Sequence, residues 1–373
     1  MVQRTVVFAA MVAICASAGL AQGPTATPPA EAWNFAVSGD SRNCGDVVMP
    51  AIAADALARG VSFYWHLGDL RKMSAIDEDI QQEAGYRGRS LTLDEYRDHA
   101  WDDFILNQIG PFGSTPFFVG IGNHELSHPK TRDEFIAQFA DWLGSPALKD
   151  QRLGDNPADH RLKTYNHWVV RGVDFINLDN ASRDQFDANQ LAWLEALVRK
   201  DSADPAIKTL VVGMHRALPE SISFGHSMNE SEEGTESGRR AYGDLLRARV
   251  AAHKNVYILA SHSHYYMDGT FNTEYWRTHG GVLPGWIIGT AGAVRYALPD
   301  GAQDARAAET NVYGYLLATV AADATVGFEL RRVTEADVPP SVRERFTPEL
   351  VHWCFEKNSE APASSTGAPT ASP

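Results

Sequence analysis

The sequence has few basic residues and, beyond its first residues, no long apolar run. It contains 33 Lys and Arg against 47 Asp and Glu, so its formal charge is −14. That charge disfavours a nucleic-acid-binding surface, because phosphate backbones require a cationic face. After residue 30 no apolar run reaches the length of about 18 residues that predicts a membrane span. No segment repeats at a fixed period, which disfavours solenoids and propellers.

The composition that remains is typical of a packed globular protein. Of the 373 residues, 44% are hydrophobic and 21% are charged. This mixture excludes disordered and collagen-like chains. Nothing in the sequence predicts an oligomeric state.

The first residues are typical of a secretory signal peptide, with Arg4 ahead of a short apolar stretch and small residues near its end. We expect cleavage after Ala21, a linker over 22–32, one domain over 33–357 and a disordered tail over 358–373. The protein is then secreted or periplasmic. Only Cys44 and Cys354 of the three cysteines survive cleavage. In an oxidising compartment they either form a disulfide or stay as two separate thiols.

Short apolar segments alternate with segments of helical spacing. The sequence predicts strands at 35–37, 61–67, 117–121, 210–212 and 256–259, a hairpin of 165–170 with 173–178, and helices at 47–58 and 133–143. Asp187 and Gln190 resemble a capping box at the start of another helix. The acidic run over 230–236 is interpreted as a solvated loop. Strands layered between helices predict an α/β (α+β) sandwich.

Five segments that follow predicted strands carry side chains able to bind metal. They are Gly39-Asp40-Ser41-Arg42, Gly68-Asp69, Gly122-Asn123-His124-Glu125, Gly213-Met214-His215 and Ser261-His262-Ser263-His264. Ligands of open α/β sheets bind beyond the carboxyl ends of the strands, so these side chains can converge there. Two carboxylates, one amide oxygen and three imidazoles suit Mn, Fe or Zn better than calcium.

The candidate metal ligands share this position at strand ends: Asp40, Asp69, Asn123, His215, His262 and His264. Asp69 can bridge two divalent or trivalent ions about 4 Å apart, an arrangement that polarises a phosphoryl group and generates hydroxide at neutral pH. His124 is the candidate general acid for the departing alkoxide.

The five segments, in this order, resemble the signature of the calcineurin-like metallophosphoesterase superfamily and its purple acid phosphatase-like branch. The resemblance implies a four-layer αββα sandwich with two metal sites. Its first ion would be held by Asp40, Asp69 and His264, and its second by Asp69, Asn123, His215 and His262.

Two residues depart from the family pattern. Lys72 stands where purple acid phosphatases have a metal-binding Tyr, and Arg42 stands where the family usually has a ligating His. A guanidinium has no free lone pair, so Arg42 cannot replace that ligand. It either grips a substrate phosphate as part of the catalytic machinery or pairs with a neighbouring acid.

The resemblance implies metal-dependent hydrolysis of a phosphate-ester substrate, with metal-bound hydroxide attacking phosphorus in line. One alternative is a binding protein of the same fold with weak or no catalysis, because a ligand of the first ion is missing. Another is a hydrolase that cleaves a non-phosphate bond. His226 either contacts substrate or is a solvated loop residue, and His66 is interpreted as a core histidine.

Overall fold

The computed structural model describes residues 31–83, 86, 88–182 and 185–360. The predicted signal peptide, most of the predicted linker and residues 361–373 of the predicted tail lie outside the described residues. Within the described ranges, no helix combines the length and apolar character needed to cross a membrane.

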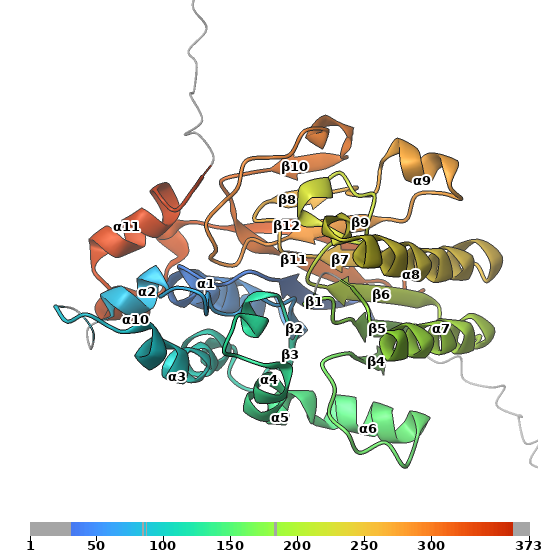
Figure 1. Cartoon of the computed structure of the whole chain (residues 1–373), viewed down its shortest axis with the longest axis horizontal. Helices are drawn as coiled ribbons and strands as arrows, with labels where there is room; N and C mark the ends of the chain where they lie inside the picture. Colours follow the sequence, from blue (N-terminus) through green and yellow to red (C-terminus); the bar gives the residue numbers. More distant parts are fainter. Residues whose placement is uncertain (1–30, 84–85, 87, 183–184, 361–373) are drawn as a thin grey trace, which may run out of the picture. The chain divides into compact units, whose positions relative to one another are not determined.

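Two mixed sheets form the centre of the fold (Figure 1). The first has the order β12-β11-β1-β2-β3, and the second has the order β10-β8-β9-β7-β6-β5-β4. The first sheet consists of β1 (Trp33–Ser38), β2 (Val61–His66), β3 (Phe117–Val119), β11 (Tyr313–Val320) and β12 (Val326–Val333). The second consists of β4 (Asn166–Val170), β5 (Val173–Asn177), β6 (Thr209–Met214), β7 (Asn255–Ala260), β8 (Tyr266–Asp268), β9 (Gly285–Ile288) and β10 (Ala307–Glu309). Strands β1 to β3 are parallel, as are β5, β6, β7 and β9, so their carboxyl ends lie together within each sheet.

Three apolar cores separate four layers. Between the sheets, aromatic rings from both sides interlock, with the centroids of Phe63 and Phe175 5.1 Å apart. A second core packs α1 (Gly45–Ala58) and α3 (Leu93–Phe104) on the first sheet. A third packs α7 (Ala188–Ala203) and α8 (Glu232–Ala251) on the second. The predicted α/β sandwich with four αββα layers is confirmed.

Shorter helices complete these layers and connect the strands. They are α2 (Glu78–Gln82), α4 (Arg132–Gln138), α5 (Ala140–Leu143), α6 (Pro146–Asp155), α9 (Glu274–Thr278), α10 (Pro340–Arg345) and α11 (Pro348–Glu356). The single helix predicted over 133–143 is divided at Phe139, whose ring is fully buried.

Two local predictions are wrong. The acidic run over 230–236 is mostly the first turn of α8, where Ser231 caps the helix by accepting from the backbone N–H of Gly234 at 2.9 Å. Acidic side chains are favourable there because a helix N-terminus carries partial positive charge. The capping box at α7 is only half formed. Asp187 accepts from the N–H of Gln190, but the Gln190 side chain bonds the backbone of Asp179 instead.

The C-terminal segment is fastened to the core by a disulfide between Cys44 and Cys354, whose Cα atoms are 5.9 Å apart. Of the two alternatives that the sequence leaves open, a disulfide or two separate thiols, the structure has the disulfide. The buried Asn358 donates to the hydroxyl of Tyr313 at 2.8 Å, and the N–H of Glu360 donates to the carbonyl of Arg295. Residues 358–360, assigned to the tail by sequence, thus belong to the packed fold.

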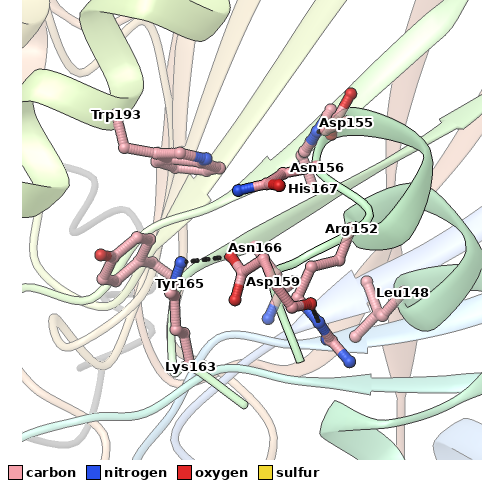
Figure 2. Close-up of a pocket in the computed structure, with 10 residues that line it drawn as sticks. All are labelled: Leu148, Arg152, Asp155, Asn156, Asp159, Lys163, Tyr165, Asn166, His167 and Trp193. Atoms are coloured by element: carbon pink, nitrogen blue, oxygen red, sulfur yellow. Dashed lines mark hydrogen bonds and ion pairs between the residues drawn. The ribbon is translucent and has the colours of Figure 1, made fainter. Parts of the chain in front are cut away.

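A cavity of about 270 Å³ lies beside β4 and α6 (Figure 2). Its wall contains a buried ion network, in which His167 lies 2.8 Å from Asp174 and 2.5 Å from Asp155. Lys163 pairs with Asp159 at 2.7 Å in the same wall. These charged groups pair with one another, so the network indicates a stabilising role.

This network predicts a pH-dependent contribution to stability. Burial opposes the charge on His167, but Asp155 and Asp174 outweigh burial and raise its pKa to about 9. Because the folded pKa exceeds the unfolded value, the contribution is complete below about pH 6.5 and is lost as the pH rises through about 9. We expect His167→Gln to lower the free energy of unfolding by about 3 kcal/mol at pH 6 and by much less at pH 10. Urea unfolding at both pH values measures this, with exposed His160→Gln as the control. An equal loss at both values would contradict it.

Candidate metal centre

The structure brings the predicted strand-end residues to one edge of the sandwich. Asp40, Asp69 and Asn123 follow β1, β2 and β3 of the first sheet, whereas His215 and His262 follow β6 and β7 of the second. Asp40, Asp69, His215 and His262 are all buried and offer ligand atoms within 4.8 Å of one another. The sequence prediction of one convergent cluster matches this placement.

Three of these residues have left-handed backbones although none is glycine. Their φ angles are 60° at Asp40, 56° at Asp69 and 65° at His262. This conformation costs roughly 1–2 kcal/mol for an ordinary residue, and such strain collects at functional sites. Each residue sits where the chain turns sharply out of its strand.

Two glycines allow the loops after β2 and β3 to touch. A Cβ on Gly68 would lie 2.5 Å from the backbone nitrogen of Gly122, and one on Gly122 would lie 2.3 Å from Oδ1 of Asp69. The buried Glu125 joins these loops by accepting from the N–H groups of Asp69, Gly122 and Leu70 at 2.8 to 2.9 Å. Burial and the charge of Asp69 raise the Glu125 pKa to about 7. The sequence motif contains Glu125, but its positioning role depends on this contact between loops.

Oxygen and nitrogen atoms with free lone pairs lie around the two ring nitrogens of His215. Its Nδ1 lies 3.1 Å from the carbonyl oxygen of Leu67, an acceptor that fixes the ring proton at Nδ1 in the neutral form. Its Nε2 then faces Asn123 Oδ1 at 3.0 Å, Asp69 Oδ1 at 3.3 Å and His262 Nδ1 at 3.1 Å. Oxygen and imidazole nitrogen atoms that converge in this way are the donor set of a transition metal.

The protonation of these groups also fits a cation. Burial acts to raise the pKa of Asp69, but His215, His124 and Arg42 hold it well below its usual value. Burial and the neighbouring His215 hold the pKa of His262 well below its usual value, which keeps it neutral as a metal ligand must be. Oδ2 of Asp69 is buried and accepts no hydrogen bond from the described residues. A buried carboxylate oxygen in that state is costly unless a cation lies beside it.

The guanidinium of Arg42 lies within the other predicted ligand set, which consists of Asp40, Asp69 and His264. The guanidinium Nη2 of this buried residue donates to His264 Nε2 at 2.9 Å, and its Nε lies 3.5 Å from Asp69 Oδ2. Asp40 Oδ1 lies 3.3 Å from the same His264 nitrogen. Tyr296 stacks on the His264 ring with centroids 4.0 Å apart, a neighbour that no sequence motif indicates. Arg42 therefore points into the cluster and not to the surface.

His124 lies at the rim of the cluster. Its Nδ1 contacts the carbonyl oxygen of Lys72, and its Nε2 faces Asp69 Oδ2 at 3.8 Å. The Lys72 ammonium pairs with Glu78 at 3.4 Å. The ring centroid of the exposed His226 lies 5.6 Å from the ring centroid of His262. His226, Glu230 and His262 together form a second group that could hold a metal ion.

His66, interpreted from the sequence as a core histidine, is fully buried. Its Nε2 lies 3.0 Å from Ser41 Oγ, and its Nδ1 accepts from the N–H of Gly68. The core interpretation is confirmed.

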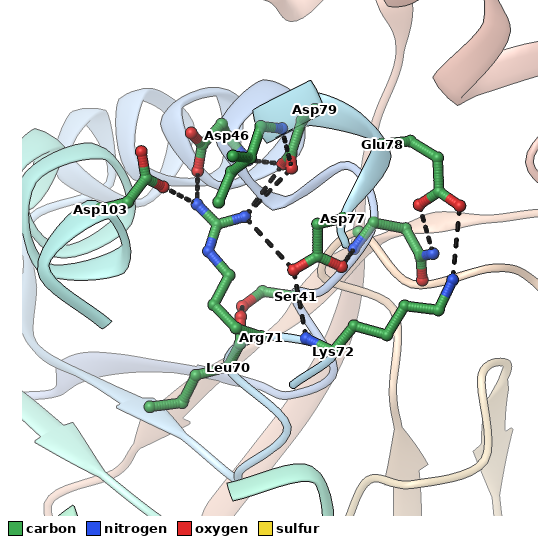
Figure 3. A network of polar contacts seen from close by, with 12 residues as sticks. Ser41, Asp46, Leu70, Arg71, Lys72, Asp77, Glu78, Asp79 and Asp103 are labelled. Carbon is green, nitrogen blue, oxygen red and sulfur yellow. Dashed lines mark hydrogen bonds and ion pairs between the residues drawn. The ribbon is translucent and has the colours of Figure 1, made fainter. Parts of the chain in front are cut away.

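A buried charge network supports the loops behind the cluster (Figure 3). Arg71, two residues beyond Asp69, is fully buried and pairs with four carboxylates, those of Asp46, Asp77, Asp79 and Asp103. Asp77 also accepts from the N–H groups of Asn43 at 2.6 Å and Lys72 at 3.1 Å. The network thus fixes the loops that follow β1 and β2.

Fold and site together define a four-layer sandwich with a buried Asp/His cluster that could hold metal. Solved structures with the same fold include a purple acid phosphatase from yellow lupin (Lupinus luteus) seeds and PhoD. The lupin enzyme is 17% identical with a TM-score of 0.51, and the match covers 82% of this chain and 52% of that one. PhoD is 14% identical with a TM-score of 0.50, and the match covers 83% and 73%.

These likenesses confirm the calcineurin-like metallophosphoesterase fold that the motif order predicts. The chain spans about half the length of the lupin enzyme. No protein-family model and no curated protein matches the sequence.

Proposed function

We propose that the protein is a metal-dependent phosphoric ester hydrolase. The observation that carries the proposal is the convergence of acceptor atoms on His215 Nε2, with Asn123, Asp69 and His262 between 3.0 and 3.3 Å away. Mn, Fe or Zn fits this mixed oxygen and nitrogen set. The sequence resemblance implies a second ion, whose ligands would be Asp40, Asp69 and His264.

When bound, the metal supplies Lewis acidity toward the phosphoryl group and activates water for attack. Two side chains, those of Arg42 and His124, supply the remaining catalytic groups. Arg42 brings a fixed positive charge to the phosphate side of the cluster, where it stabilises the negative charge of the transition state. His124 presents Nε2 toward the cluster while Nδ1 is held by the Lys72 carbonyl, so its protonated ring can give the Nε2 proton to the departing alkoxide.

We also propose that the protein is exported to the periplasm or the exterior. The disulfide between Cys44 and Cys354 supports this, because structural disulfides persist in oxidising compartments. The predicted signal peptide points to the same destination.

Removal of metal tests the activity. We expect chelation to reduce hydrolysis of aryl phosphate mono- and diesters to the background rate, and added Mn²⁺, Fe²⁺ or Zn²⁺ to restore it. Circular dichroism before and after chelation checks that the apoprotein stays folded. Unchanged turnover after complete metal removal would contradict a metal-dependent mechanism.

The competing proposal is a non-catalytic binding protein, and Arg42 inside the first ligand set favours it. Metal binding without turnover of any phosphate ester would support that proposal. A hydrolase of another bond would instead turn over carboxylic esters in the same assay format.

A further inference from the structure

We propose that Arg42 takes the place of one of the two metal ions, so that the centre holds a single ion. This inference concerns the site of the proposed function and rests on that site binding metal. The sequence resemblance implies two metal ions. We infer that the centre instead holds one metal ion beside the permanently charged guanidinium of Arg42.

The first ligand set is already engaged by the guanidinium. Arg42 Nη2 is 2.9 Å from His264 Nε2, and its Nε is 3.5 Å from Asp69 Oδ2. The Nδ1 of His264 lies 2.6 Å from the carbonyl oxygen of Val294, so the ring proton resides at Nδ1. The Nε2 lone pair is therefore the one that a metal would need, and Arg42 already occupies it.

The charge balance agrees with this geometry. Asp40 and Asp69 are both fully buried, and two carboxylates in such a place require a cation. Arg42 is 7% exposed and carries a charge that it cannot lose in a protein. An added divalent ion would lie against this cation and be repelled.

The loop that carries Arg42 is fixed in this position. The next residue, Asn43, donates its backbone N–H to Asp77 and its side-chain amide to Glu78, both at 2.6 Å. The residue after that, Cys44, is in the disulfide. These contacts thus fix the backbone from which the Arg42 side chain extends.

The second ligand set differs from the first in the atoms that contact it. Around His215 Nε2 the three contacting atoms are Asn123 Oδ1, Asp69 Oδ1 and His262 Nδ1, which are metal-ligand atoms. The closest contacts of Arg42 are with the first set. One ion in the second set and one guanidinium in the first would thus share Asp69 as their common anion.

Metal stoichiometry tests the inference. Elemental analysis after equilibration with excess Mn²⁺ and gel filtration should give one ion per wild-type chain and two per chain in Arg42→His, which restores an imidazole. Arg199→His, at the ion pair with Glu195 within α7, is the control and should keep one ion. If Arg42→His does not fold, Arg42→Gln removes the charge and should also gain a second, weaker ion.

Two ions in the wild type, none in the wild type, or one ion in both Arg42 variants would overturn the inference. Because metal is counted independently of turnover, the two proposals can fail separately. One bound ion without phosphate-ester hydrolysis would refute the proposed function alone. Two bound ions with hydrolysis would refute only the single-ion centre.

Discussion

Asp69→Asn is expected to lower kcat/KM for an aryl phosphate ester by about 100-fold, whereas Asp40→Asn should cost roughly tenfold less. Asp69 takes part in both ligand sets, because Oδ1 faces His215 at 3.3 Å and Oδ2 faces Arg42 at 3.5 Å. Its Oδ1 also accepts from the backbone N–H of His124 at 3.0 Å, which fixes the candidate acid. Asp40 faces His264 of the first set with Oδ1 at 3.3 Å, and its Oδ2 accepts from the backbone N–H of His262 at 2.6 Å.

Steady-state kinetics with saturating metal, together with metal content, measure both effects. Asp244→Asn on α8 is the matched control, since Asp244 is also buried but pairs with Arg247 away from the cluster. It should retain nearly full activity. Equal small losses in Asp69→Asn and Asp40→Asn would contradict the shared role of Asp69.

Loss of the disulfide is expected to lower the free energy of unfolding by up to about 6 kcal/mol in the chain-entropy model. The bond joins residues 310 positions apart, so it restricts a very large loop of the unfolded chain. It also ties α11 to the start of α1, directly beside the Arg42 loop. Urea unfolding of the Cys44→Ser/Cys354→Ser variant should match that of the wild type under strong reductant. A loss below about 1 kcal/mol would show that the closed loop contributes little.

Much of the site was predictable from local sequence. Asp40 and Asp69 follow the neighbouring parallel strands β1 and β2, whose carboxyl ends share an edge, so strand prediction places these two residues together. His262 follows β7 of the other sheet and joins them where the two sheets pack. Hydrophobic periodicity also gave the β4–β5 hairpin and most of α1, because their core-facing residues recur at regular spacing.

The features that sequence could not supply depend on residues far apart in the chain. Arg42 meets His264 across 222 positions, and only the packed loops decide whether it faces the cluster or the surface. Tyr296 and Val294 contact His264 from a segment without any motif. Glu125 holds two loops through backbone N–H groups, which any residue provides, so no side-chain pattern marks them. The start of α8 was missed because its acidic composition also suits a loop.

The left-handed backbones at Asp40, Asp69 and His262 imply that stability and function favour different residues at these three positions. At each position glycine would relieve the conformational strain, yet glycine has no side chain to offer. Selection for stability alone would therefore favour glycine over Asp40, Asp69 and His262, whose side chains belong to the candidate metal cluster. Non-glycine residues in this conformation at three positions of the candidate metal cluster are what a functional site, and not the fold, would require.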